Sequence, residues 1–273
     1  MATVAESLDK AFASPPAEAG ITAFIDRWIW VFMAALFVVT VLVGFVPDSI
    51  AKVGAVEAGA RPPFPPILHV HAVLMGSWML LLLTQATLMA TGHSAWHKQL
   101  GMLSFGLAPA IVVAGSILVP TIYHMNWSAA QAAPAARAAE MHGRMVFLTN
   151  VMLVQLRAGV MFPICAGIAL WARRHDLGLH KRMIFLATLV PLPASIQRME
   201  WLPTTLPGSP LALSLYALVL IAPLLLWDLY RLRRVHRAYL IWLALFVPTG
   251  LAVQLLWNSP WWFATAPRLM GVA

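Results

Sequence analysis

Charged side chains are scarce in this chain. Asp, Glu, Lys and Arg together make up 10% of its 273 residues, whereas 61% of the residues are hydrophobic. A soluble domain carries about 25% charged residues. A water-exposed surface could not be built from so small a supply, so the composition predicts a protein whose solvent is lipid.

Cysteine is almost absent, and lysine is missing from the long apolar runs. The single Cys165 excludes a disulfide framework or a cysteine-based metal site within one chain. The absence of lysine from the apolar runs excludes the Schiff base of a retinal protein. Residues 1–22 also lack an apolar period, and acidic residues interrupt them. They are predicted to form a flexible arm and not a cleaved signal peptide, ahead of a single transmembrane helical domain at residues 23–273.

The apolar residues are gathered in long runs. Runs of roughly 18 residues or more mark helices that can span a bilayer. Seven are found: Trp28–Val46, Ile67–Thr91, Leu100–Ile122, His142–Trp171, Met183–Arg198, Leu211–Tyr230 and Ala238–Trp257. The sequence therefore predicts an all-α polytopic membrane protein with seven transmembrane helices and a four-helix core made by helices two to five. Pro191 and Pro193 predict an irregular outer end for the fifth run.

The net charge of +8 is distributed unevenly between the two predicted faces. One face carries Lys10, Arg27, Lys98, Arg173, Arg174, Lys181, Arg182, Arg231, Arg233, Arg234 and Arg237. The other face carries Lys52, Arg61, Arg137, Arg198 and Arg268. This asymmetry is typical of membrane topology and not of nucleic-acid binding. The positive-inside rule predicts a cytoplasmic N-terminus and an external C-terminus, in a bacterial inner membrane.

Four histidines occupy matching places in consecutive runs. His71, His97, His142 and His180 each lie near the beginning of the second to fifth predicted helices. Because consecutive helices run in opposite directions, His71 and His142 are expected near the outer face, and His97 and His180 near the inner face. Low-spin b-type haem takes two axial imidazoles, one on each side of the ring. The pattern predicts one or two b haems, each held by a histidine pair.

The residues that share a face with these histidines are apolar or small. At about 100° per residue, His97, Gly101, Ser104 and Ala108 lie on one stripe of the third helix. Such a stripe admits a flat macrocycle, but small residues four apart also serve ordinary helix packing in membranes. His69 is the alternative outer ligand.

Three arginines are further candidates for cofactor binding. Arg144 lies beside His142, Arg157 lies deep in the fourth predicted span, and Arg198 lies at the end of the fifth. A cation within the bilayer needs a partner, and a haem propionate or a quinone carbonyl would provide one. Glu200 is an alternative partner for Arg198, and Gln155, Asn150 or backbone carbonyls are alternatives for Arg157.

The placement of one histidine at the beginning of each of four consecutive helices resembles the cytochrome b561 superfamily. The stretch His97-Lys98-Gln99-Leu100-Gly101 resembles the H-x-x-L-G pattern of these and related bacterial membrane proteins, and the resemblance covers about residues 67–198. It implies that His71 and His142 ligate an outer haem, and His97 and His180 an inner one. The implied activity is transmembrane electron transfer, an oxidoreductase role with a quinone or another redox protein as partner. The family usually has six helices, whereas seven are predicted here.

Two other classes of function stay open at the level of sequence. His69, His71, His93 and His97 could serve a non-haem metal-handling or small-solute membrane protein, and His93 and His97 have the spacing of a copper or zinc site on a helix. The chain could also be a structural or assembly subunit of a larger membrane complex, or a homodimer, with interfacial histidines. The sequence names neither the electron donor nor the acceptor.

Overall fold

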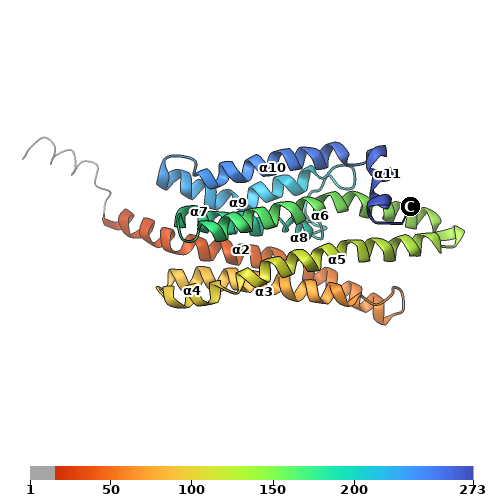
Figure 1. The fold of residues 1–273 in the computed structure, drawn as a ribbon, viewed down its shortest axis with the longest axis horizontal. Coiled ribbons are helices and arrows are strands. Elements are labelled where there is room, and N and C mark those ends of the chain that lie inside the picture. Colours follow the sequence, from red (N-terminus) through yellow and green to blue (C-terminus); the bar gives the residue numbers. More distant parts are fainter. Residues whose placement is uncertain (1–15, 273) are drawn as a thin grey trace, which may run out of the picture.

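The structure, a computed structural model, describes residues 16–272 and is built from helices, with no strand among those residues. Six helical segments are long and apolar enough to cross a membrane, which confirms the all-α membrane class. The longer helices lie roughly side by side along one axis (Figure 1). The helices of the described residues, long and short together, are α2 (Pro16–Glu57), α3 (Pro66–Ala90), α4 (Ser94–Gly101), α5 (Ser104–Gln131), α6 (Ala138–Ala172), α7 (Leu177–Leu189), α8 (Pro193–Ile196), α9 (Leu211–Leu232), α10 (Arg237–Leu256) and α11 (Pro260–Leu269), with a short 3-10 turn at Ala135–Arg137.

The connections that carry the basic clusters lie at one end of the bundle. The α3–α4, α6–α7 and α9–α10 connections are at the left in Figure 1, and the beginnings of α3 and α6 are at the right. We call the left end the basic end. His97 and His180 are near the basic end, whereas His71 and His142 are near the opposite end. The alternation predicted from sequence is therefore present in the fold.

The first helix begins earlier than the sequence predicts. α2 starts at Pro16, so residues 16–22 of the predicted arm are helical. The prediction failed there because it relied on apolar periodicity, whereas Ala and Glu are strong helix formers that can extend a helix without an apolar face. Residues 1–15 of the predicted arm lie outside the described residues.

The third predicted span is divided into two helices. α4 ends at Gly101 and α5 begins at Ser104, so His97 lies on a short helix of its own before the long one. Gly92 makes the turn between α3 and α4 with a φ of 84°, a conformation that L-residues with side chains rarely adopt. The turn brings α4 back beside the end of α3.

The fifth predicted span is broken. α7 has 13 residues, and α8 follows with four after a turn at 190–192. Pro191 and Pro193 have no amide hydrogen to donate, which prevents a continuous helix here. Neither piece is among the six long apolar segments, so the count of seven spans is not confirmed.

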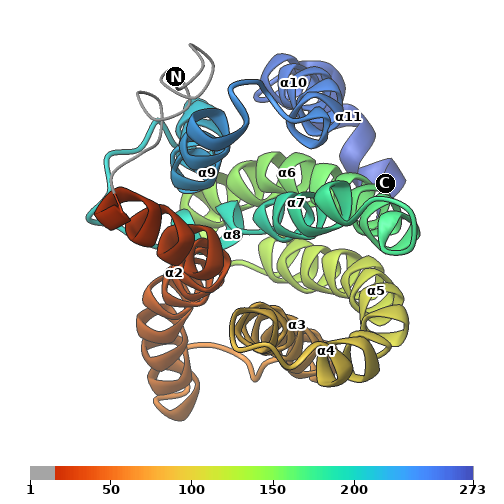
Figure 2. The ribbon, with the colours of Figure 1, turned by 90° about the vertical axis from the view of Figure 1, so that its left-hand side faces the viewer.

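Helices α6 and α7 lie at the centre of the bundle. Viewed along the bundle in Figure 2, α2 to α5 lie on one side of them and α9 and α10 on the other. Trp78 of α3 connects α3 with α6 and α7. Its indole Nε1 donates to Thr188 Oγ1 at 3.0 Å, and its ring packs edge-on against Phe162 with 5.2 Å between ring centroids. Aromatic side chains therefore fill the middle of the core between the two histidine levels.

The close approach of α2 to α8 predicts an effect on stability. A Cβ on Gly44 would lie 2.3 Å from the carbonyl oxygen of Ser195, whose hydroxyl donates to Thr40 O at 2.6 Å. We expect Gly44→Ala to lower the free energy of unfolding by about 1–3 kcal/mol through overpacking. Gly54→Ala in the same helix has open space around it and should be neutral or stabilising by up to about 1 kcal/mol. Unfolding in detergent measures both, and equal stabilities would contradict the contact.

Candidate functional site

The imidazoles of His97 and His180 are oriented in the same way. His180 Nδ1 lies 2.8 Å from the carbonyl oxygen of Ala169, and His97 Nδ1 lies 3.3 Å from that of Gln85. A carbonyl can only accept, so Nδ1 must carry the hydrogen and donate in both rings. In the neutral ring this leaves Nε2 with a free lone pair, which is the tautomer of a metal-ligating histidine whose other nitrogen is held by the protein.

The two imidazoles come from different helices at the basic end. His97 is on α4 and His180 is on α7, and their rings are close enough to interact electrostatically. Both side chains are half-buried. The fold thus brings together two histidines that are far apart in the sequence and that were predicted to form the inner pair.

The beginning of α7 is fixed by a capping residue, which in turn positions His180. The Asp176 carboxylate accepts from the Leu179 amide at 2.9 Å, and the Asp176 carbonyl accepts from the His180 amide at 2.9 Å. The hydrogen bond from Leu179 and the nearby Arg237 hold the pKa of the Asp176 carboxyl below its ordinary value. The cap therefore keeps its negative charge at the positive end of the helix dipole.

A small-residue surface and an unpaired amide lie beside the inner pair. The Gln85 side chain has both its buried oxygen and nitrogen without a hydrogen-bond partner among the described residues. A Cβ added to Gly101 would lie 3.4 Å from Gln85 Nε2, so the amide sits against the glycine. Ser104 and Ala108 continue this surface and are buried. Unpaired buried amides are costly, and this one marks a place where a polar group of a ligand would be stabilised.

Arg173 is a third basic group near the inner pair, and sequence reasoning did not select it. It interacts electrostatically with His180. Its guanidinium lies 4.5 Å from the centre of the Phe105 ring and donates to Leu170 O at 2.9 Å. No ion pair with a carboxylate is formed by Arg173 within residues 16–272. Its position one residue after α6 gave no signal, because a basic cluster also serves topology.

The predicted outer pair has a different geometry. His71 is half-buried and packs against α5, where a Cβ on Gly115 would lie 3.6 Å from its Cε1. Its Nδ1 is buried and has no hydrogen-bond partner among the described residues. His142 and Arg144 are exposed on the first turns of α6. No described contact joins His71 to His142.

Arg157 faces away from the histidines. Its guanidinium donates to Phe246 O at 2.8 Å, to Thr249 Oγ1 at 3.1 Å and to Ser214 Oγ at 3.3 Å, and it lies over the Phe246 ring at 4.1 Å. These partners belong to α9 and α10. They satisfy most of the hydrogen-bonding capacity that was expected to attract a propionate or a quinone.

Arg198 pairs with α2 rather than with Glu200. Its Nε donates to Asp48 Oδ2 at 3.1 Å, and its guanidinium lies 4.3 Å from the centre of the Phe45 ring. Asp48 also pairs with Lys52 at 2.6 Å. The carboxylate that engages Arg198 is therefore shared between two cations at the end opposite the basic end.

The remaining candidate ligands lie apart from one another. His69 is exposed and meets Phe64 edge-on at 6.0 Å. His93 Nδ1 lies 2.9 Å from Thr91 Oγ1. No group of three or more His, Cys, Asp or Glu side chains suited to one metal ion occurs in the part of the chain that the structure describes.

An open cleft of about 510 Å³ lies beside the first turns of α6, at the end opposite the basic end. Gly143 and Phe147 line one wall, and Leu213 and Tyr216 of α9 line another. Glu200 and Gln197 supply its polar groups, and most of its surface is apolar. Its volume is in the range of small-molecule sites.

A buried ion pair was also missed by sequence reasoning. Asp228 accepts from Arg182 Nε at 2.7 Å and from the Tyr239 hydroxyl at 2.5 Å, and all three residues are buried. The available signal was an acidic residue inside a predicted span, which requires a partner. Sequence alone could not choose among the many basic residues of that face.

No protein-family model, curated protein or solved structure matches this chain.

Proposed function

We propose that this chain binds b-type haem through His97 and His180 and carries electrons across the bilayer. The observation that carries the proposal is the shared orientation of the two imidazoles, each with Nδ1–H donated to a backbone carbonyl of a neighbouring helix. Helix capping or solvation would not require this arrangement twice at one site. Histidines that ligate a metal through Nε2 almost always donate their other ring N–H in this way.

The chemistry of the surroundings fits the group. Gly101, Ser104 and Ala108 give the α4–α5 side small side chains against which a flat ring could pack once the neighbouring side chains shift, and Arg173 offers a cation for a propionate. The unpaired Gln85 amide would gain a polar partner. When bound between two imidazoles, b haem supplies one-electron chemistry whose potential depends on ligands, hydrogen bonds and burial. The protein's part is to hold the two rings and exclude water from them.

For the opposite end we propose a quinol as the electron donor or a quinone as the acceptor. The apolar cleft beside Gly143 has the size and polarity of a small-molecule site, and His142 and Arg144 lie in the same turns of α6. A second haem would need His71 and His142 to move together. A single haem at the basic end lies about a bilayer thickness from this cleft, so electron transfer between the two ends would need this second haem.

The proposed topology has seven passages through the bilayer, with the broken α7–α8 segment as the fifth. α7 is enclosed by neighbouring helices and its side chains are mostly buried. Irregular backbone at membrane depth is tolerated where protein covers it. The basic end would then face the cytoplasm of a bacterial cell.

The direct test is an absorption spectrum of the detergent-purified protein, oxidised and then reduced. We expect a red protein whose reduced spectrum has the sharp bands of low-spin haem, and the pyridine haemochrome assay then gives one or two haems per chain. Iron, copper and zinc are measured on the same sample. A colourless protein from haem-replete cells would refute the proposal, and copper or zinc without haem would favour the non-haem metal alternative.

A further inference from the structure

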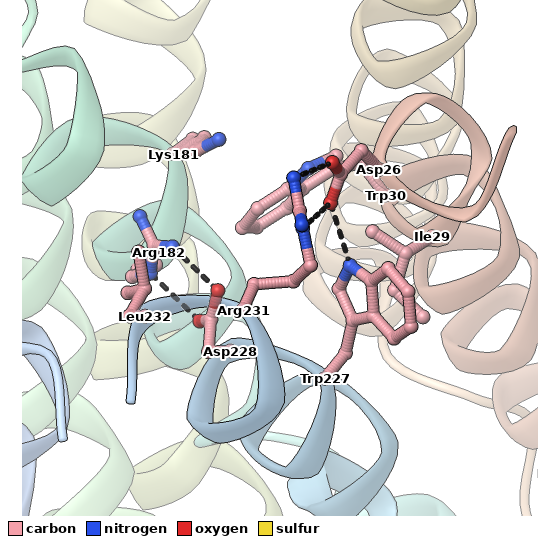
Figure 3. A pocket seen from close by; sticks show the side chains of 9 residues that line it. All are labelled: Asp26, Ile29, Trp30, Lys181, Arg182, Trp227, Asp228, Arg231 and Leu232. Atoms are coloured by element: carbon pink, nitrogen blue, oxygen red, sulfur yellow. Dashed lines mark hydrogen bonds and ion pairs between the residues drawn. The ribbon is translucent and has the colours of Figure 1, made fainter. Parts of the chain in front are cut away.

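An open cleft of about 350 Å³ lies between α2, α7 and α9 at the basic end (Figure 3). Lys181 and Arg182 of α7 line it from one side, and Asp228 and Arg231 of α9 from another. Trp30 of α2 completes the wall. The cleft combines several cations with an aromatic side chain, and it lies near the ends of the long apolar helices.

The deep part of the cleft is electrically balanced. Arg182 and Asp228 are buried and form a two-point ion pair, with Arg182 Nε 2.7 Å and Nη2 2.5 Å from the carboxylate. Tyr239 adds a third hydrogen bond to Asp228 at 2.5 Å. The charge of the Asp228 carboxylate is therefore already neutralised by Arg182.

The rim keeps an uncompensated positive charge. Asp26 accepts from Arg231, at 2.8 Å, and from Trp227 Nε1, at 2.9 Å. Lys181 is exposed and has no carboxylate partner among the described residues; its ammonium lies 4.6 Å from the centre of the Trp30 ring. With the two ion pairs neutral, Lys181 leaves the cleft with a formal charge of +1.

The cleft is flanked by apolar side chains. Ile29 and Leu232 belong to the lining, and Phe32 of α2 and Leu226 and Tyr230 of α9 are exposed nearby along the same helices. A water-soluble anion would gain nothing from these side chains, whereas acyl chains would cover them. Tryptophan is also typical of the headgroup level of a bilayer.

We propose that this cleft is a binding site for the headgroup of an anionic phospholipid, whose phosphate is held by Lys181 and Arg231 and whose acyl chains lie along the exposed apolar side chains of α2 and α9. The proposal does not rest on haem binding. It assigns one lysine of the basic end to a specific contact, in addition to the general attraction between basic residues and anionic lipid.

Native mass spectrometry of the full chain in detergent tests the site. The protein is incubated with dioleoyl phosphatidylglycerol or with dioleoyl phosphatidylcholine at equal concentration. We expect preferential retention of one phosphatidylglycerol. Lys181→Gln should weaken this retention about fivefold, the loss expected for one basic residue at a membrane surface, and Lys181→Arg should preserve it.

Lys98→Gln is the matched control, because Lys98 is an exposed lysine on the same end but outside the cleft. Unchanged elution and unfolding temperature of Lys181→Gln establish that its fold is intact. Equal losses in Lys181→Gln and Lys98→Gln would overturn the site in favour of general surface attraction. Displacement of the lipid by millimolar inorganic phosphate would also overturn the lipid assignment, since it would identify a water-soluble phosphate as the occupant.

Discussion

His97→Ala and His180→Ala should each reduce the haem bound at the basic end by at least about tenfold. Removing groups that merely orient a metal ligand typically lowers metal affinity 10- to 100-fold, and loss of an axial ligand should cost no less. The ratio of haem absorbance to protein absorbance in purified variants measures the effect. Because the two rings come from α4 and α7, loss in both variants would mean that one site needs both helices.

His175→Ala is the control for these variants. His175 is exposed, lies in the connection before α7 and contacts Trp171 at 5.6 Å between ring centroids, so it is a histidine of the same end of the bundle that lies outside the proposed site. Its haem content should equal that of the unaltered protein. Full haem content in both His97→Ala and His180→Ala would rule out ligation by this pair. His71→Ala, measured beside them, reports whether a second haem is bound at the opposite end.

Asp228→Asn should lower the free energy of unfolding by about 3–5 kcal/mol. The side chains of Arg182 and Asp228 are 6% and 5% exposed, so the variant leaves a guanidinium buried without its counter-charge. Breaking a buried ion pair from one side typically costs this much, because the remaining charge cannot be solvated. Unfolding in detergent, followed by circular dichroism, measures the change.

The double variant Arg182→Met, Asp228→Asn separates charge from packing. It removes the unpaired cation and keeps an oxygen that can accept from the Tyr239 hydroxyl, so we expect it to regain most of the lost stability. Asp26→Asn is the matched control, because it breaks an exposed ion pair. The side chains of Asp26 and Arg231 are 40% and 43% exposed, and the free energy of unfolding should fall by at most about 1 kcal/mol. Equal losses in Asp228→Asn and Asp26→Asn would show that burial does not strengthen the inner pair.

Local signals predicted most of the helices and missed the breaks. Apolar runs located α3, α6, α9 and α10 within a few residues, whereas α2 extends well beyond its predicted run at both ends and α5 extends beyond its run at the C-terminal end. The division of the third run at 102–103 had no such signal, since no proline lies there. In the fifth run the prolines predicted an irregular end, but they did not predict that α7 has only 13 residues.

The arginines show why a site is harder to predict than a helix. Arg157 was selected because a deep cation needs a partner, and that requirement is met. The partners are Ser214, Thr249 and a carbonyl of α10, which no spacing within α6 could reveal. Arg198 likewise pairs with Asp48, 150 residues away in the chain.

The sequence by itself determined that the chain is suited to a lipid bilayer, that it is helical, and that histidines alternate between the two ends of the bundle. These properties depend on composition and on direction along the chain, which are local. Only the tertiary structure decided what surrounds each histidine. The rotation of each helix about its axis is set by contacts such as Trp78 with Thr188 and Gly44 with Ser195. In the resulting packing His97 and His180 lie at the same end of the bundle within electrostatic range, His71 lies against Gly115, and His142 is exposed.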